Sequence, residues 1–182
     1  MHIFKSIVLY AANAAALGFT IPEGQPDGVY AVSYDAHGVP VHHFVSGPVE
    51  ESVISPYVSG GGGGKPFLHA RQTDARKCEG HDLDHSNTDA AVEALKRQCD
   101  PAGAVGGGLD FYSVAGNTVA YLCNYASTSV ACTRNLLTDS YAAITANCGL
   151  YRSGWRDLTG GNYRYSIGYE PYGNKFCGRG TN

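Results

Sequence analysis

The stretch Leu109–Tyr125 (LDFYSVAGNTVAYLCNY) decides the fold that we expect for this chain. Its two halves, residues 109–114 and 118–125, are rich in aromatic and β-branched residues and flank a short turn that contains Gly116 and Asn117. This pattern is typical of two antiparallel strands joined by a tight turn. Because side chains alternate along a strand, residues 118–125 present apolar groups on both faces. The second half is therefore predicted to be a central strand.

A helix is predicted on each side of this hairpin in the sequence. Residues 86–89 (SNTD) offer a Ser-x-x-Asp start signal, and apolar residues follow at helical spacing as far as Cys99. The second helix is expected from about residue 134 to residue 147. Thr133 is its predicted N-cap, and Gly149 is placed to end it.

Further strands are predicted near both ends of the chain. Residues 163–169 alternate tyrosine or isoleucine with smaller or polar residues. Residues 28–34 and 39–45 are two runs of β-forming residues around a turn, and Pro40 marks the second as an edge strand or a strand start. This order favours an α+β fold: a small antiparallel sheet with two helices packed on one face, stapled by disulfides, plus an N-terminal β-hairpin appendage.

The N-terminus has the layout of a secretory signal peptide. Lys5 supplies a positive charge, an apolar run follows, and residues 16–18 end it with small side chains. The apolar run, residues 6–18, is shorter than the roughly 20 residues that a membrane-spanning helix needs. We therefore expect residues 1–18 to be removed, a mature chain that starts near Phe19, a secreted, extracellular location and no transmembrane segment.

Composition divides the rest of the chain into three parts. Residues 19–58 hold the predicted hairpin. Residues 59–77 are a predicted flexible linker, because the consecutive glycines at positions 60–64 have no side chains to pack. Residues 78–182, which contain all the cysteines, are the predicted disulfide-bonded α/β sandwich domain.

The cysteines predict a disulfide framework. They are even in number and follow a predicted export signal, so three disulfides are expected among Cys78, Cys99, Cys123, Cys132, Cys148 and Cys177. Six cysteines allow about 15 pairings, and spacing alone does not choose among them. We expect Cys123 to close locally with Cys132, Cys99 to join the two helices through Cys148, and Cys78 to tie the domain ends together with Cys177.

Charge and polar clusters exclude several functions. The net charge is −3 at pH 7, and the composition lacks the concentration of Lys and Arg that phosphate binding needs, so nucleic acid is not expected as a general partner. The densest polar cluster is residues 81–85 (HDLDH), whose two histidines could share a metal ion on a helix. The cluster precedes the predicted helix, where acidic groups complement the helix dipole. We therefore expect solvent-exposed side chains there, no metal site and no cofactor.

Three groups of residues carry a resemblance to a known kind of protein. They are the segment from Cys78 through Asp89-Ala90-Ala91-Val92 to Cys99, the strand Val119–Tyr125, and the run from Ala143-Ile144 through Cys148-Gly149 and Gly154-Trp155 to Phe176-Cys177. In cysteine order and architecture over residues 78–177, the chain resembles cysteine-rich secreted proteins of filamentous fungi, including the killer-toxin-like and necrosis-inducing effector families. The resemblance implies an α/β sandwich and an effector or toxin-like protein with a role in virulence.

The expected function is binding of an extracellular target, which could be a protein, a cell wall or a membrane surface. We expect a monomer that acts without catalytic residues. Aromatic side chains give a large contact area at a low cost in conformational entropy. Trp155, Tyr163, Tyr165 and Tyr169 are therefore the expected contact residues.

The alternative is a small secreted hydrolase that acts on RNA or polysaccharide with Glu170, Arg164 and a histidine. General acid–base catalysis requires its groups to lie within hydrogen-bond reach of the reacting atoms. The alternative therefore requires His81 or His85 to reach Glu170 in a cleft.

Overall fold

The computed structural model describes residues 18–47, 73–100 and 103–178. Except for Gly18, the predicted signal peptide lies outside the described residues, as do the glycines at positions 60–64. The elements, in chain order, are β1 (Gly28–Tyr34), β2 (Pro40–Ser46), β3 (Thr73–Asp82), α1 (His85–Gln98), β4 (Gly103–Val105), β5 (Asp110–Ala115), β6 (Thr118–Asn124), β7 (Val130–Cys132), α2 (Arg134–Cys148), β8 (Arg152–Gly160) and β9 (Tyr163–Pro171).

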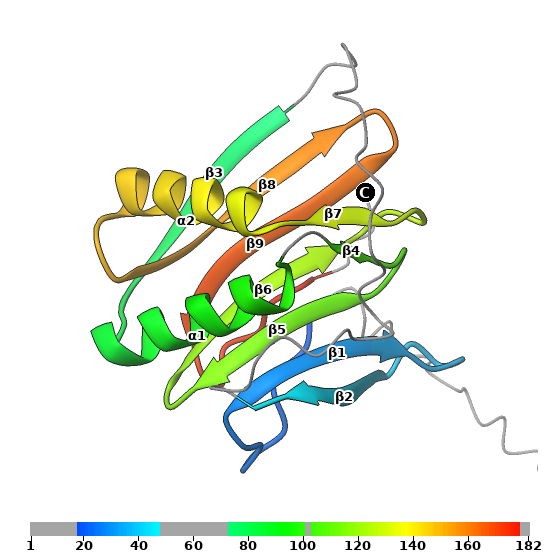
Figure 1. The fold of residues 1–182 in the computed structure, drawn as a ribbon, viewed down its shortest axis with the longest axis horizontal. Helices are drawn as coiled ribbons and strands as arrows, with labels where there is room; N and C mark the ends of the chain where they lie inside the picture. Colours follow the sequence, from blue (N-terminus) through cyan, green and yellow to red (C-terminus); the bar gives the residue numbers. More distant parts are fainter. Residues whose placement is uncertain (1–17, 48–72, 101–102, 179–182) are drawn as a thin grey trace, which may run out of the picture.

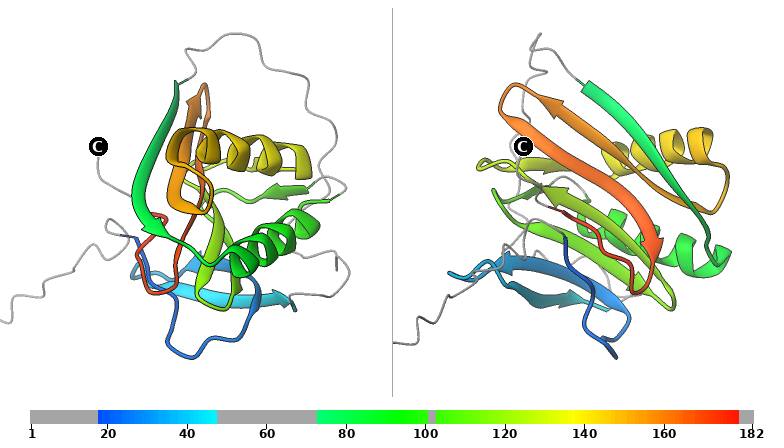
Figure 2. Two further views of the ribbon diagram at one scale, coloured as in Figure 1. Left: turned by 90° about the vertical axis from the view of Figure 1, so that its left-hand side faces the viewer. Right: turned by 180° about the vertical axis from the view of Figure 1, so that it is seen from behind.

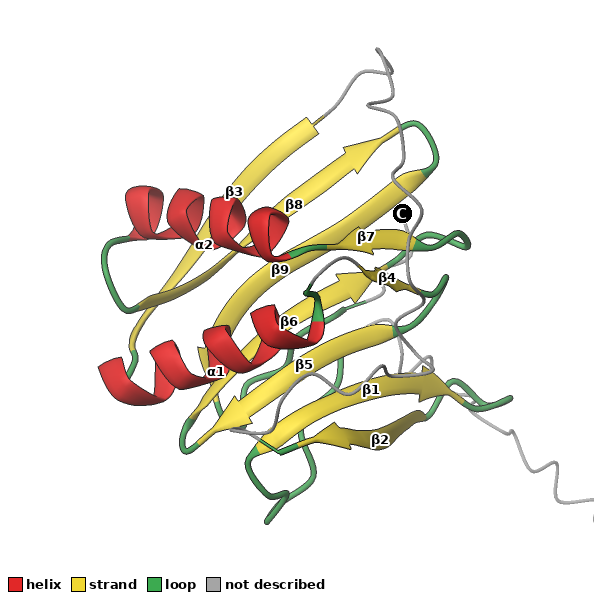
Figure 3. Cartoon of the chain, viewed as in Figure 1, coloured by secondary structure: helices red, strands yellow, loops and turns green. Residues whose placement is uncertain are grey.

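Most of the molecule is one antiparallel sheet. Seven strands lie in the order β2-β1-β5-β6-β9-β8-β3, and every neighbouring pair is antiparallel (Figure 1). The hairpin β5–β6 lies at its centre, as the sequence predicts, with Tyr112 opposite Tyr121. A second, two-stranded ladder joins β4 to β7 on the helix side of the large sheet (Figure 3).

Two helices cover one face of the sheet, and the α+β class is confirmed. Helix α1 packs on β5 and β6, whereas α2 packs on β3, β8 and β9 (Figure 2). The core beneath the helices includes Leu95 of α1, Leu137 and Ile144 of α2, and Leu122 and Ile167 of the sheet, all fully buried. Within the part of the chain that is described, neither helix has the length and apolar character needed to span a bilayer.

The opposite face is covered only in part, by segments from both ends of the chain. Phe19 and Phe176 form an isolated antiparallel bridge, and their rings lie 4.7 Å apart. They pack on Tyr30, Tyr112 and Tyr121, which point away from the helices. The rest of this face, over β9, β8 and β3, is left open to form the candidate site described below.

The N-terminal hairpin is part of the main sheet and not an appendage. Strand β1 pairs with β5 along its length, with Tyr30 opposite Tyr112 and Ala31 opposite Phe111. Ala31 is buried in the core beneath the helices and Tyr30 in the core on the opposite face, so both faces of β1 are covered. The sequence contained the hairpin but no information on which strand would accept its edge.

Residues 73–77, predicted as part of a linker, instead begin the edge strand β3. The strand pairs with β8 from Thr73 opposite Thr159 to Asp82 opposite Arg152, with an irregularity after Cys78. All of its residues are exposed, so it lacks the apolar alternation from which strands are predicted. The strand forms because its backbone hydrogen-bonds to β8, and this partner is available only in the tertiary structure.

The helix ends follow the sequence with one correction. Thr133 caps α2 as predicted, since its side chain accepts a hydrogen bond from the Leu136 amide. Helix α1 begins earlier than expected, because Asp84 and not Ser86 is its N-cap. The Asp84 carboxylate accepts a hydrogen bond of 2.9 Å from the Asn87 amide, while the Ser86 hydroxyl donates to the same carboxylate.

All six cysteines form disulfides, as predicted, but every expected pairing is wrong. The bonds are Cys78–Cys148, Cys99–Cys132 and Cys123–Cys177. Cys123 points to the face opposite the helices, whereas Cys132 lies in the core beneath them. The helices run in opposite directions across the sheet, so Cys99 and Cys148 lie at opposite ends of it (Figure 1).

Candidate functional site

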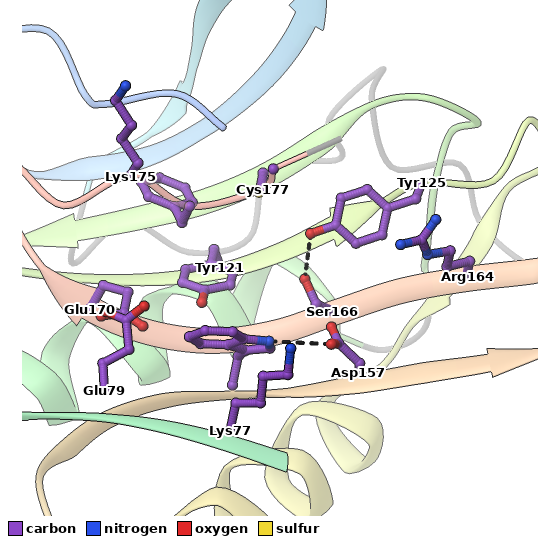
Figure 4. Close-up of a pocket in the computed structure, with 13 residues that line it drawn as sticks. Lys77, Glu79, Tyr121, Tyr125, Asp157, Arg164, Ser166, Glu170, Lys175 and Cys177 are labelled. Atoms are coloured by element: carbon purple, nitrogen blue, oxygen red, sulfur yellow. Dashed lines mark hydrogen bonds between the residues drawn. The ribbon is translucent and has the colours of Figure 1, made fainter. Parts of the chain in front are cut away.

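A pocket with a volume of about 280 Å³ lies on the sheet face opposite the helices (Figure 4). Strands β6, β9, β8 and β3 form its floor, and the segment Lys175–Gly178 forms one wall. Disulfide Cys123–Cys177 attaches this wall to β6. The pocket is therefore built from segments that are distant in the sequence and held together by a covalent bond.

One row of residues crosses the whole floor. Tyr121 of β6 lies opposite Gly168 of β9, Gly168 opposite Trp155 of β8, and Trp155 opposite Lys77 of β3. Lys77 places its Nζ atom 5.8 Å from the centre of the Trp155 ring, within the range of a cation–π contact. An aromatic ring and a cation thus lie side by side at the middle of the pocket.

Gly168 makes the hollow in this row. A Cβ atom at this position would lie 2.5 Å from the Tyr121 hydroxyl and 2.7 Å from the carbonyl oxygen of Gly154. No real Cβ tolerates such distances, so only glycine lets the Tyr121 ring lie across β9. Tyr121 is held from above by Phe176, whose ring stacks on it at 4.8 Å.

The next row of the floor is polar. Ser166 of β9 lies opposite Asp157 of β8. The Tyr125 and Ser166 hydroxyls are hydrogen-bonded at 2.8 Å, and the Trp155 Nε1–H donates to Asp157 at 3.3 Å (Figure 4). Hydroxyl, carboxylate and indole groups therefore occupy fixed positions at this end of the pocket.

Two carboxyl groups meet at the other end of the pocket. Glu170 of β9 and Glu79 of β3 direct their side chains toward each other, although β8 lies between their strands (Figure 4). Glu170 is 1 % exposed, and its carboxyl oxygens have the Glu79, Asn174 and Ser153 side chains as polar neighbours but no well-aligned hydrogen bond within the described residues. Burial, and after it the neighbouring Glu79 carboxyl, together raise the pKa of Glu170 to about 9, so Glu170 is protonated at neutral pH.

Glu79 lies at the outer side of this pair. Its side chain is 32 % exposed and accepts a hydrogen bond of 3.5 Å from the Asn174 amide. His81 Nε2 lies 3.9 Å from Glu79 Oε2, the one ion-pair contact of either carboxyl within the ranges described. No Lys or Arg of the described chain forms an ion pair with Glu170 or Glu79.

The four predicted contact residues separate onto two faces. Trp155 lines the pocket. Tyr169 is 3 % exposed and stacks on Tyr141 of α2, and Tyr163 and Tyr165 pack half-buried against the same core. The three tyrosines alternate along β9 with the pocket residues, so their side chains face the helices and do not reach the pocket.

The structure brings together only part of the predicted hydrolase site. Arg164 and Glu170 both line the pocket, but six residues of extended β9 separate their Cα atoms by roughly 20 Å. Arg164 instead lies over the Tyr125 ring, 5.3 Å from its centre. None of the histidines in the described ranges lines the pocket, and neither His81 nor His85 hydrogen-bonds to Glu170.

The polar cluster at residues 81–85 divides between two elements. His81 lies near the C-terminal end of β3. His85 is the first residue of α1, and its ring stacks on Tyr151 with the ring centres 3.9 Å apart. The two histidines therefore do not share a helix face. In the described ranges, the one group of three potential metal ligands is Asp110, Cys123 and Cys177, whose two sulfur atoms are bonded to each other.

Four pocket residues carry no sequence motif that marks them as site residues: Lys77, Glu79, Tyr121 and Asp157. Lys77 lies in the predicted linker and Glu79 just after it. In residues 77–80, charged residues alternate with uncharged ones, which is the period of a β-strand. This alternation was the available signal. Tyr121 was assigned to a strand face, but which face would stay open depends on where the helices pack.

Comparison of the chain with protein-family models, with curated proteins and with solved structures finds no match.

Proposed function

We propose that this protein is a secreted, effector- or toxin-like binding protein whose pocket binds a cell-wall polysaccharide. The observation that carries the proposal is the composition of the pocket: aromatic rings, carboxylates and cationic side chains alternate on one rigid sheet face. Trp155 and Tyr125 supply the rings, Asp157 the carboxylate, and Lys77 and Arg164 the cations.

A hydroxyl-rich ligand matches this mixture better than a polyanion. Each sugar hydroxyl can donate to a carboxylate and accept from a cationic side chain, so one ligand can use both kinds of group. A phosphate chain would gain from the cations but would be repelled by Asp157 and Glu79. The pocket therefore favours a neutral, hydrogen-bonding polymer.

The disulfides support a role outside the cell. Three disulfides in a chain of this size are typical of an oxidising compartment and protect a small protein against unfolding. Cys123–Cys177 also fixes one wall of the pocket, so the site is formed before the ligand arrives. Such preorganisation lowers the entropy cost of binding.

Binding is favoured over hydrolysis because the pocket lacks the predicted histidine. Glu170 could donate a proton at neutral pH, but among the described residues the one base beside it is its partner Glu79 (Figure 4). The two carboxyls face each other as a pair (Figure 4), whereas the carboxyls of glycosidases flank the scissile bond at a separation of roughly 5 Å or more.

The proposal is tested by a depletion assay with insoluble chitin, β-1,3-glucan and cellulose. The wild-type protein should be removed from solution by at least one of them. Trp155→Ala and Asp157→Asn should each weaken that binding at least tenfold, because each removes a central contact of the pocket. Asp157→Asn changes charge without changing size, so its loss of binding would not reflect a loss of packing.

Leu150→Ala is the matched control, since Leu150 is 67 % exposed and lies outside the pocket. It should bind as the wild type does. If none of the polysaccharides depletes the wild-type protein, or if both pocket variants bind normally while remaining folded by circular dichroism, polysaccharide binding through this pocket is excluded.

A further inference from the structure

The facing carboxyl groups of Glu79 and Glu170 present an electrostatic problem that no described cation solves. Both oxygens of Glu170 are buried without a well-aligned hydrogen bond among the described residues, a state that native proteins rarely tolerate. Lys77 directs its ammonium group over Trp155, and Lys175 extends away from the pair (Figure 4). The site therefore either keeps a proton or takes up a cation from solution.

We propose that Glu79 and Glu170 bind a calcium ion at the inner end of the pocket. Two carboxylates supply up to four oxygen atoms and two negative charges, which a divalent cation neutralises. An ammonium or guanidinium group would leave one charge uncompensated in a buried site. The proposal does not depend on polysaccharide binding.

The surrounding atoms fit calcium better than a transition metal. The buried Ser153 hydroxyl lies beside the pair, the Asn174 amide donates its N–H to Glu79, and the open pocket would supply the remaining ligands as water. Oxygen ligands of this kind suit Ca²⁺, which accepts six to eight of them in flexible geometry. His81 contacts Glu79 from outside but does not complete a group of three ligands.

Calcium must compete with a proton. Burial and the Glu79 carboxyl from β3 favour the protonated form of Glu170, whereas the Asn174 and Ser153 side chains favour its carboxylate. The Tyr121 hydroxyl from β6 is uncharged at neutral pH, because burial raises its pKa. At neutral pH the bound ion therefore displaces one proton to the solvent: the Glu170 acid and the Glu79 carboxylate become two carboxylates on Ca²⁺. Affinity should consequently rise with pH, by up to about tenfold for each unit below pH 9.

The test is isothermal titration of the full secreted protein, stripped with EDTA, with calcium chloride alone at pH 6.5, 7.5 and 8.5. With two carboxylates, a dissociation constant of about 0.1–1 mM is expected at the highest pH, in the range of extracellular modules. Repeating the titration at pH 7.5 in buffers of different ionisation enthalpy should show release of close to one proton per ion.

Glu170→Gln keeps the size of the side chain and should weaken calcium binding at least tenfold. The matched control is Glu23→Gln, because Glu23 is exposed and lies outside the pocket. Its calcium affinity should equal that of the wild type. Absence of binding to the wild type at 10 mM calcium (about tenfold above the expected constant), equal loss in both variants, or binding without proton release would each overturn the proposal.

Discussion

Glu170 of β9 and Glu79 of β3 meet across β8, the strand that separates them, with their carboxyl groups facing each other in a pocket. They can do so because Ser153, the β8 residue between them on this face, has a small side chain. A Cβ on Gly154 would lie 2.5 Å from the Lys77 carbonyl oxygen, so β3 also approaches β8 closely here.

This relationship predicts a stability that falls as pH rises. The pKa of Glu170 is about 9 in the folded protein and about 4.3 in an unfolded chain. At a pH below the pKa of the unfolded chain, Glu170 is protonated in both states, so its burial causes no pH-dependent loss of stability. Between the two values only the unfolded state releases the proton, so unfolding becomes more favourable with each rise in pH.

Glu170→Gln should remove this dependence, because glutamine does not titrate. Thermal melts in EDTA at pH 5, 7 and 9 should show that the melting temperature of the variant increases relative to that of the wild type as pH rises. The exposed Glu23→Gln variant should follow the wild type throughout. A constant difference between Glu170→Gln and the wild type across this range would show that Glu170 is not buried as an acid.

Gly168→Ala should destabilise the protein by about 1–3 kcal/mol, because the added methyl group would overlap the Tyr121 hydroxyl and the Gly154 carbonyl. Urea denaturation measures the loss. In a Tyr121→Ala background, where the hydroxyl and the ring carbon Cζ that lies 2.6 Å from the added Cβ are both absent, the same substitution should cost less. An equal cost in both backgrounds would mean that Tyr121 does not occupy this hollow.

The disulfide pairing is open to direct mapping. Peptides from a non-reduced digest at acidic pH should link Cys78 to Cys148, Cys99 to Cys132 and Cys123 to Cys177. Recovery of a peptide linking Cys123 to Cys132 would contradict the arrangement of β6 and β7.

Cys123→Ser with Cys177→Ser should lower the free energy of unfolding by about 2–4 kcal/mol, since it frees the chain end that forms the pocket wall. The stacking of Phe176 on Tyr121 should loosen with it. Tyrosine near-ultraviolet circular dichroism reports this change. An unchanged spectrum would show that Phe176 holds its place without the bond.

Asp84→Ala should cost about 1 kcal/mol of stability, the usual value for loss of an N-cap. Ser86→Ala should cost less, because Ser86 only donates to Asp84 and does not accept from the first helical turn. Chemical denaturation of the two variants compares them. If Ser86→Ala costs more stability than Asp84→Ala, Ser86 and not Asp84 is the N-cap of α1.

The sequence by itself determined the central hairpin, the second helix with its Thr133 cap, the last strand and the presence of disulfides. Each of these depends on local chemistry: alternating apolar residues, a capping side chain, or an even set of cysteines. Such signals lie within a few residues of the structure they specify.

Only the tertiary structure decided the cysteine partners, the place of the N-terminal hairpin and the existence of β3. A disulfide depends on which faces two distant strands or helices turn toward each other, and an exposed edge strand depends on the neighbour that supplies its hydrogen bonds. Neither property is encoded by the spacing of nearby residues.

The same reason explains the candidate site. The sequence placed Trp155, Arg164 and Glu170 among the residues of interest but could not show that Tyr163, Tyr165 and Tyr169 face the helices. Alternation along β9 was visible in the sequence; which of its two faces the helices would cover was not. Glu79 acquires its place beside Glu170 only when β3 and β9 flank β8, because close packing and burial are properties of the assembled sheet.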